Sequence, residues 1–395
     1  MKLRCIACGT SYPADKIRYT CDCGNLLAVE RDTFPTSTQL FDDRRASRKT
    51  IDQSGVWRFR EAVLDVDDGD IVTHPEGSTR LYERNGIFFK HEGENPTGSF
   101  KDRGMTVAVT QAVRLGATAI ACASTGNTSA SLAAYAAQAG LRALVFIPAG
   151  KVAAGKLAQT LAYGATCLAV RGDFDAAMSL VREACDRLGI YLVNSINPFR
   201  IEGQKTIVWE LLQDLEWNAP DWIVVPAGNL GNTSAFGKAL AEAHAAGWIA
   251  KMPKIASIQA SGANPFFRSF RENFAQRHRV TAETIASAIR IGDPVSYEKA
   301  VAAIRDTNGL VAEVTDEELM SAKRDIDRMG IGCEPASATT LAGVRKLKLT
   351  GKIVCVLTGH VLKDPDAILK NSPAEQMIEI DPTIDAVEQA LKSRS

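Results

Sequence analysis

Residues 118–147 read TAIACASTGNTSASLAAYAAQAGLRALVFI, and this stretch decides the fold. It opens with a short apolar run (118–123), continues with a segment that has the amphipathic spacing of a helix (129–139), and ends with a second apolar run (142–147). A strand, a helix and a further strand in this order form the repeating unit of a parallel β-sheet with right-handed crossovers. We therefore expect a parallel sheet here.

The same alternation of short apolar runs and longer amphipathic segments continues along the chain. It predicts further strands at 166–170, 191–194, 221–225, 254–259, 310–314 and 352–357, and helices at 155–163, 173–188, 233–246, 316–329 and 335–347. We expect an α/β fold of two parallel-sheet domains with a cleft between them. The large domain is expected to comprise 55–101 and 196–395 and the small domain 102–195, preceded by a zinc-ribbon-like module (1–30) and a linker (31–54).

Composition narrows the class of protein. The chain has 395 residues, 46% of them apolar, and its 46 basic and 46 acidic residues give a formal net charge of zero. A general nucleic-acid or membrane-surface binder needs a basic excess, so neither partner is expected. The longest uncharged stretch (115–141) is too rich in Ser, Thr and Asn to span a membrane, and the N-terminus lacks the apolar core of a secretion signal. We expect a soluble, cytoplasmic protein.

Four of the nine cysteines lie in the first 23 residues, in the strings CIACG and CDCGN. Cys5 and Cys8 form one pair and Cys21 and Cys23 the other, and each pair is followed directly by a glycine. Two such turns can present four thiolates to one tetrahedral Zn²⁺. The second pair has the spacing C-x-C where C-x-x-C is commoner, so a degenerate ribbon that binds no metal is the alternative.

Two loops are rich in Gly, Asn, Ser and Thr and follow predicted strands: 123–129 (ASTGNTS) and 226–234 (PAGNLGNTS). Ligands of open α/β sheets bind in such loops, and a helix N-terminus adds positive potential. The second loop is the better phosphate cup, although neither matches a nucleotide-binding fingerprint. Glycine-rich turns that bind nothing are the alternative.

A third segment, 93–103 (GENPTGSFKDR), precedes an amphipathic helix. Lys101 lies at or near the start of that helix, where the helix dipole disfavours a cation and lowers the pKa of the amine. An amine with a lowered pKa is a nucleophile that can form an imine with a carbonyl group. Taken alone, a lysine in this position would be read as solvated.

Together, four strings resemble the threonine synthases, which are pyridoxal-phosphate enzymes of the tryptophan-synthase β-subunit fold. They are PTGSFKDRG (96–104), STGNTSAS (124–131), NSINPFRIEGQKT (194–206) and LTGHVLKDP (357–365). The resemblance extends from about Gly55 to about Pro365, and some members of that family carry an N-terminal cysteine ribbon.

The resemblance implies roles for particular residues. Lys101 matches the Schiff-base lysine, Asn127 the partner of the pyridine 3′-oxygen, and Thr358 the hydroxyl that faces the pyridine nitrogen. The cup for the cofactor phosphate corresponds to Gly228, Asn229, Leu230, Gly231 and Asn232. The substrate carboxylate corresponds to Ser124, Thr125 and Thr128, and the substrate phosphate to Asn194, Ser195, Asn197 and Arg200. Glu334 could contact the cofactor edge or serve the dipole of the following helix.

The implied reaction converts O-phospho-L-homoserine and water to L-threonine and phosphate, in a pyridoxal 5′-phosphate enzyme that forms homodimers and is not activated by S-adenosylmethionine. Two other enzymes stay open: a serine or threonine dehydratase, and a replacement enzyme that uses O-phosphoserine. A non-enzymatic reading takes the cysteine module as a recruiter of nucleic acid or a protein partner.

Overall fold

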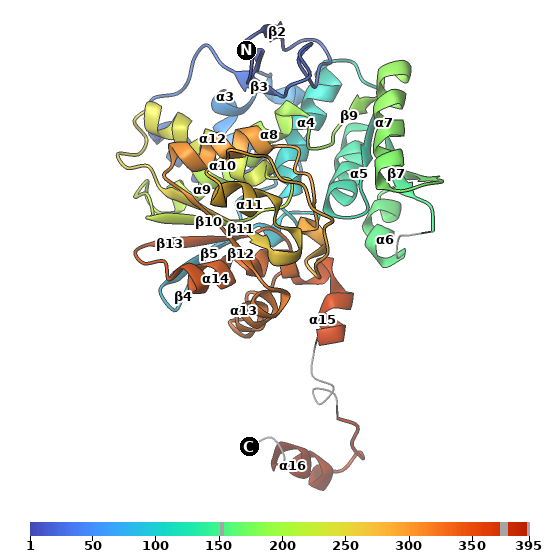
Figure 1. Cartoon of the computed structure of the whole chain (residues 1–395), viewed down its shortest axis with the longest axis vertical. Helices are drawn as coiled ribbons and strands as arrows, with labels where there is room; N and C mark the ends of the chain where they lie inside the picture. The colour runs from blue at the N-terminus through green and yellow to red at the C-terminus, as the bar shows by residue number, and fades with distance from the viewer. Residues whose placement is uncertain (151–153, 372–377, 393–395) are drawn as a thin grey trace. The chain divides into compact units, whose positions relative to one another are not determined.

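The computed structural model describes residues 1–150, 154–371 and 378–392. The chain divides into two compact units, residues 1–363 and 364–395. The first unit contains three sheets (Figure 1). In the second unit the described residues form helices α15 (Pro365–Asn371) and α16 (Ile384–Lys392).

The largest sheet has six strands in the order β12-β11-β10-β13-β5-β4. Its strands are β4 (Leu81–Arg84), β5 (Ile87–His91), β10 (Trp222–Pro226), β11 (Lys254–Ala260), β12 (Leu310–Val314) and β13 (Ile353–Leu357). All neighbours pair in parallel except β4, which is antiparallel to β5. The four strands predicted after residue 220 are confirmed, because runs of Val, Ile, Leu and Ala are what a sheet covered on both faces requires.

The β4–β5 hairpin was not predicted. Its turn consists of Asn85 and Gly86, which both have positive φ (53° and 75°). Asn-Gly is a strong signal for a tight hairpin turn, so the sequence does contain the information.

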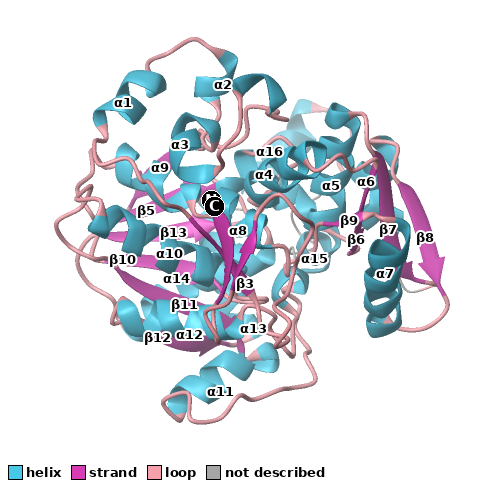
Figure 2. Cartoon of the chain, turned by 90° about the horizontal axis from the view of Figure 1, so that it is seen from above, coloured by secondary structure: helices cyan, strands magenta, loops and turns pink. Residues whose placement is uncertain are grey.

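The second sheet has four parallel strands in the order β8-β7-β6-β9. They are β6 (Ala119–Ala123), β7 (Arg142–Pro148), β8 (Thr166–Val170) and β9 (Tyr191–Leu192), and α5 (Asn127–Ala139), α6 (Ala154–Ala162) and α7 (Phe174–Leu188) connect them. These elements confirm the predicted strand–helix alternation within two residues at each boundary. Figure 2 shows the two sheets in separate parts of the first unit.

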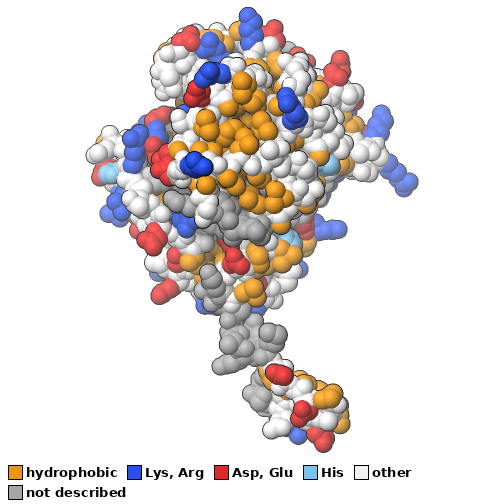
Figure 3. Space-filling view, turned by 90° about the vertical axis from the view of Figure 1, so that its right-hand side faces the viewer, with side chains coloured by type: hydrophobic (Ala, Val, Ile, Leu, Met, Phe, Trp, Pro, Cys, Tyr) orange, Lys and Arg blue, Asp and Glu red, His pale blue; other side chains and the backbone are white. Residues whose placement is uncertain are grey.

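Exposed apolar side chains occur on α7 (Phe174, Leu180 and Leu188), and Figure 3 shows such side chains gathering on that side.

The other helices of the first unit surround these sheets. They are α1 (Gln39–Arg45), α2 (Thr50–Gln53), α3 (Arg60–Val63), α4 (Lys101–Arg114), α8 (Pro198–Gln204), α9 (Thr206–Asp214), α10 (Gly231–Ala245), α11 (Pro265–Arg271), α12 (Tyr297–Asp306), α13 (Asp316–Arg328) and α14 (Pro335–Leu347). Residues 31–54, expected to be a linker, thus include α1 and α2, and Phe41 of α1 is fully buried against Phe59 and Trp248. Among the described residues, no helix is long and apolar enough to cross a membrane.

The N-terminal module is a three-stranded antiparallel sheet of β1 (Lys2–Cys5), β2 (Ser11–Pro13) and β3 (Leu27–Glu30). Its apolar residues belong to the same core as Phe199 and Ile201 of α8. Although its sequence is distinct, the module is not structurally separate from the α/β core. Three short strands cannot enclose a core of their own, so their apolar face is buried against the helices.

Partly buried hydrogen bonds also attach this module to α10, α12 and β9. The Nζ atoms of Lys238 and Lys299 donate to the backbone oxygens of Val29 (2.7 Å) and Leu27 (2.6 Å). On the other side, the Tyr19 hydroxyl accepts from the backbone N–H of Leu192 in β9 (2.7 Å). The module therefore contacts elements on both sides of the first unit.

Candidate active site

The start of α4 is held against the end of β13. The backbone N–H of Phe100 donates to the oxygen of Thr358 (3.0 Å), and that of His360 donates to the oxygen of Gly98 (2.9 Å). The loop that ends in Lys101 is thus paired with the segment that follows β13. This brings Lys101 and Thr358, far apart in sequence, into one site.

Two charged residues next to Lys101 fix this loop. The Asp102 carboxylate accepts from the backbone N–H (2.7 Å) and hydroxyl (2.6 Å) of Thr97. Arg103 is fully buried and forms ion pairs with Glu92 (2.6 Å) and Glu210 (2.8 Å). Both side chains point away from solvent into the core, so the string KDR anchors the loop and the first turn of α4.

The amine of Lys101 has an unusual environment. Its removal from water, together with the nearby charge of Arg200, lowers the pKa of Lys101 to about 7, and Glu334 opposes the shift. The Nζ atom lies over the Phe100 ring, 4.2 Å from its centroid. A substantial fraction of this amine is therefore neutral at pH 7, which is the form that attacks carbonyl groups and accepts protons.

Glu334 accepts hydrogen bonds from polar side chains near Lys101. One of its oxygens accepts from Asn127 Nδ2 (3.0 Å) and the other from Thr358 Oγ1 (3.1 Å). Burial raises the pKa of the Glu334 carboxyl, while Asn127, Thr358 and Lys101 lower it. Glu334 is the N-cap residue of α14, yet its side chain makes no capping hydrogen bond. Of the two roles considered for it, the geometry favours a contact inside the site.

Helices α5 and α10 are among those that begin without a side-chain cap. Helix α5 follows Gly126, and α10 follows Leu230, which has a left-handed backbone (φ 63°) although it is not glycine. Loop residues 124–128 are partly exposed, so Ser124, Thr125 and Thr128 are accessible. Unsatisfied N–H groups at such ends bind anions.

In the cup formed by residues 228–232, the backbone of Gly228 lies close to that of Ile289. A Cβ atom on Gly228 would lie 2.9 Å from the Cα atom of Ile289. Asn232 is buried and its Oδ1 atom has no hydrogen-bond partner among the described residues. The side chain of Asn229 bridges outward: its Oδ1 accepts from the N–H of Val295 (3.2 Å), and its Nδ2 donates to Ser195 Oγ (3.4 Å). The cup is thereby joined to the 194–200 segment.

Arg200 is a buried cation with no anion beside it. It is 2% exposed, and its one hydrogen bond among the described residues runs from Nη1 to the backbone oxygen of Val193 (3.2 Å). Its Nε is buried and unpartnered, and no described carboxylate lies within ion-pair distance. Burial lowers the pKa of Arg200 to about 10. A buried guanidinium without a counter-ion is costly, so this position suits a bound anion.

Asn194 and Asn197 differ from Arg200 because the fold already uses their side chains. Asn194 accepts from the N–H of Ala123 (3.0 Å) and donates to its oxygen (3.1 Å). Asn197 caps α8 by accepting from the N–H of Phe199 (3.0 Å), and it donates to the oxygen of Leu192 (2.8 Å). These contacts hold the 194–200 segment against β6 and β9.

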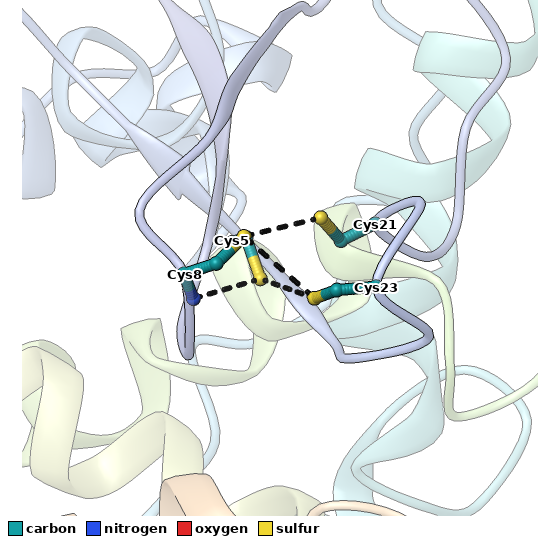
Figure 4. A group of neighbouring side chains, drawn as sticks. All are labelled: Cys5, Cys8, Cys21 and Cys23. Carbon is teal, nitrogen blue, oxygen red and sulfur yellow. Dashed lines mark hydrogen bonds between the residues drawn. The ribbon is translucent and has the colours of Figure 1, made fainter.

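The four N-terminal cysteines form a second candidate site. Their sulfur atoms all lie within 4.8 Å of one another, with Cys8–Cys21 at 3.5 Å and Cys5–Cys23 at 3.6 Å (Figure 4). Four sulfurs around one Zn²⁺ at 2.3 Å would be roughly 3.8 Å apart. The cluster could therefore hold a metal ion, and the short C-x-C spacing does not prevent convergence.

The comparisons with known proteins agree with this geometry. Residues 70–359 match the family described as pyridoxal-phosphate dependent enzymes. The chain is 45% identical to a threonine synthase of Methanocaldococcus jannaschii, over 99% of this chain and 100% of that one. It is 44% identical to a threonine synthase of Synechocystis, over 92% and 96% of the two chains.

A solved structure shows the same fold at low identity. The threonine synthase of Escherichia coli superposes with a TM-score of 0.73 and 19% identity, over 99% of this chain and 94% of that one. The family match over residues 70–359 shows that the chain is a pyridoxal-phosphate dependent enzyme. Within that class, the chain belongs to the threonine synthase family.

Proposed function

We propose that this chain converts O-phospho-L-homoserine and water to L-threonine and phosphate. Arg200 carries the proposal: a buried guanidinium without a carboxylate partner lies near enough to Lys101 to lower the pKa of its amine. A substrate that brings its own phosphate supplies the missing anion, and a guanidinium can bind it through two parallel hydrogen bonds. The phosphate-free substrate of a dehydratase would leave Arg200 unpaired.

The site fits pyridoxal phosphate. The uncapped start of α10 and the tight backbone at Gly228 suit the cofactor phosphate, with Asn229, Leu230, Gly231 and Asn232 completing the cup. Asn127 and Thr358 are proposed to face the 3′-oxygen and the nitrogen of the pyridine ring, and Lys101 to bind the carbonyl carbon. When bound, the cofactor supplies a sink for the negative charge that develops on the substrate.

The other residues bind the substrate and move protons. The uncapped start of α5, with Ser124, Thr125 and Thr128, is proposed to hold the substrate carboxylate. The free amine of Lys101 is proposed to remove the proton from Cα and, after releasing that proton and becoming neutral again, to remove one from Cβ. Arg200 and Ser195 are proposed to hold the phosphate as it leaves, while Asn194 and Asn197 position them. A proton is then returned at Cγ, water adds at Cβ, and Cα regains a proton to complete L-threonine.

Further assignments belong to the same proposal. The cluster of Cys5, Cys8, Cys21 and Cys23 is proposed to hold one structural Zn²⁺. Residues 102–195 are proposed as the small domain, since all four strands of the β8-β7-β6-β9 sheet fall within them. We further propose a cytoplasmic homodimer that acts on small molecules and not on nucleic acid or membranes.

A direct assay tests the proposal. The holoenzyme is incubated separately with O-phospho-L-homoserine and O-phospho-L-serine, and both phosphate and amino-acid products are measured. Equal amounts of phosphate and threonine from the first compound are expected, with little release from the second. Release from O-phosphoserine alone, or 2-oxobutanoate as the main product, would overturn the assignment.

A further inference from the structure

A large pocket lies on the side of the first unit where the N-terminal module meets the helices. Its volume is about 940 Å³, and β3, α8, α10 and α12 contribute to its walls. Figure 1 shows β3 beside α8, with α10 and α12 close to them. Lys101, Asn127, Thr358 and Arg200 do not line this pocket, so it is distinct from the candidate active site.

The walls combine apolar and charged side chains. The apolar residues include Val29, Phe34, Ile201 and Val301. Two carboxylates, Glu202 and Glu242, are already paired with lysines: Lys205 lies 2.6 Å from Glu202 and 2.9 Å from Glu242, and Lys238 also pairs with Glu202. Within this group the two lysines and the two carboxylates balance.

Two further cations of the pocket are not part of this group. Arg31 and Lys299 line the pocket, and neither forms an ion pair with any residue that the structure describes. The Nε and Nη2 atoms of Arg31 are buried without a hydrogen-bond partner. Among the residues that the structure describes, Lys299 has a single acceptor, the backbone oxygen of Leu27, for three N–H groups. Burial lowers the pKa of Arg31, although Glu202 and Glu242 oppose this shift. Burial also lowers the pKa of Lys299 to about 8, with Lys238 adding to the effect and Glu202 opposing it.

The remaining charges of the pocket do not neutralise this pair. Glu30 is paired with Lys2 (3.2 Å) and Arg4 (3.1 Å). Glu298, Asp306 and Arg305 are exposed, so water and salt screen their charges. Removing cations partly from water without an ion-pair partner has a cost, and an anion that enters from solvent would reduce that cost.

We propose that this pocket binds a small organic anion, with its oxyanion at Arg31 and Lys299 and its apolar body against Val29, Phe34 and Ile201. The oxyanion can be a carboxylate or a phosphate, since both accept from a guanidinium and an ammonium group. Such a ligand touches α8 and α10, the helices that carry Arg200 and the cofactor cup. The pocket does not depend on the reaction proposed above.

The test uses 8-anilinonaphthalene-1-sulfonate, an apolar ring system with a sulfonate, and follows its fluorescence with the holoenzyme. One probe per chain is expected to bind at this pocket. The double variant R31Q/K299Q should weaken that binding at least about tenfold, because two charge-assisted contacts are lost. Glutamine at 299 keeps a donor for the Leu27 oxygen. The matched control R305Q, at an exposed arginine of the same pocket, should bind as the unmodified protein does.

Two comparisons make the result specific. N-phenyl-1-naphthylamine, the same ring system without the sulfonate, should bind the unmodified protein and R31Q/K299Q alike. Benzoate and phenyl phosphate should then compete with the sulfonate probe, and the stronger competitor identifies the preferred oxyanion. Circular dichroism and denaturant unfolding verify that R31Q/K299Q is folded, which is expected because neither side chain forms an ion pair.

Several outcomes would overturn the proposal. Unchanged sulfonate binding in the folded double variant would show that the two cations do not bind anions. Failure of both competitors would exclude the two oxyanion classes. If light scattering shows that R31Q/K299Q dissociates a dimer while probe binding is unchanged, the pocket is part of an interface between copies of this chain.

Discussion

Lys101 owes its reactivity to its neighbours more than to its own side chain. Burial and Arg200 lower the pKa of its amine to about 7, whereas Glu334 raises it. The neutral fraction of such an amine rises about tenfold between pH 6 and pH 8. We therefore expect the cofactor-free protein to take up pyridoxal phosphate about tenfold faster at pH 8 than at pH 6, as followed by visible absorbance.

Variants of the two charged neighbours, Arg200 and Glu334, serve as controls for this prediction. Arg200→Ala should move the midpoint of the pH dependence upward, and Glu334→Gln should move it downward. Lys101→Ala should retain the fold but lose turnover, and borohydride should no longer attach the cofactor to the chain. A Lys101→Ala protein that still forms threonine would contradict the role of this amine.

Arg200 makes a separate prediction about the substrate. Because the structure shows no carboxylate beside this buried guanidinium, its loss should affect the substrate phosphate and not the fold. Arg200→Ala should raise the activation free energy that corresponds to kcat/KM for O-phospho-L-homoserine by about 2–4 kcal/mol. This is a roughly thirtyfold to thousandfold loss of kcat/KM. The cofactor spectrum should be nearly unchanged, and slow reactions with serine or threonine should decline far less.

Arg200→Lys serves as the matched control for that variant. It keeps a positive charge but loses the planar pair of donors, so an intermediate loss of kcat/KM is expected. If Arg200→Ala instead releases the cofactor or slows both classes of substrate equally, the phosphate assignment is wrong and a dehydratase becomes the better interpretation.

At the scale of elements, we expect the N-terminal sheet to depend on its cysteine cluster. Cys5 and Cys21 are buried in the same core as α8, while Cys8 and Cys23 are exposed. We expect about one zinc per chain by metal analysis, and Cys8→Ser/Cys23→Ser should lose it. Because β3 packs on the helix that carries Arg200, metal loss should both lower the unfolding midpoint and raise KM for the phosphorylated substrate.

Cys167→Ser is the control for the cysteine cluster. Cys167 lies on β8, outside the cluster, so its replacement should leave zinc content and KM unchanged. Protein that is fully folded, free of zinc and unaltered by Cys8→Ser/Cys23→Ser would show that the ribbon needs no metal.

The strands and helices of the two parallel sheets could be predicted because their signal is local. An apolar run such as 119–123 followed by a helical spacing is visible without knowing what packs against it. The Asn85–Gly86 turn of the β4–β5 hairpin is an equally local signal, although the strand prediction does not include it. The burial of Phe41 could not be predicted, because it depends on Phe59 and Trp248, which are distant in sequence.

Some residues of the candidate site could likewise be predicted from local sequence, and others could not. Strings such as PTGSFKDRG identify Lys101, and the loops after the strands identify Asn127 and the cup. The side chain of Glu334 could not be placed, because Glu334 and its partners Asn127 and Thr358 lie in three separate segments of the sequence. For the same reason, sequence alone did not distinguish Arg200, which lacks a partner, from Asn194 and Asn197, which have them.

At the scale of the whole molecule, Glu210 of α9 joins distant segments. Its carboxylate pairs with Lys90 of β5 (2.6 Å), Arg103 of α4 (2.8 Å) and Arg58 (3.0 Å), and it is 1% exposed. These cations hold the pKa of Glu210 well below its ordinary value. Removing one partner from such a cluster leaves buried charges uncompensated, which costs about 3–5 kcal/mol. Glu210→Gln should lower the free energy of unfolding, measured in denaturant at pH 7, by about that amount.

The same residue predicts how stability depends on pH. In the folded protein Glu210 stays ionised to lower pH than in the unfolded chain, where its pKa is about 4.3. Its contribution is therefore fully present above that pH and is lost as the pH falls below it. Below that pH, the slope of the free energy of unfolding against pH should be smaller in Glu210→Gln than in the unmodified protein. The difference between the two slopes should be about 1.4 kcal/mol per pH unit. Glu83→Gln, at an exposed position of β4, should follow the unmodified protein. Parallel curves for Glu210→Gln and the unmodified protein would show that another carboxylate carries the acid sensitivity.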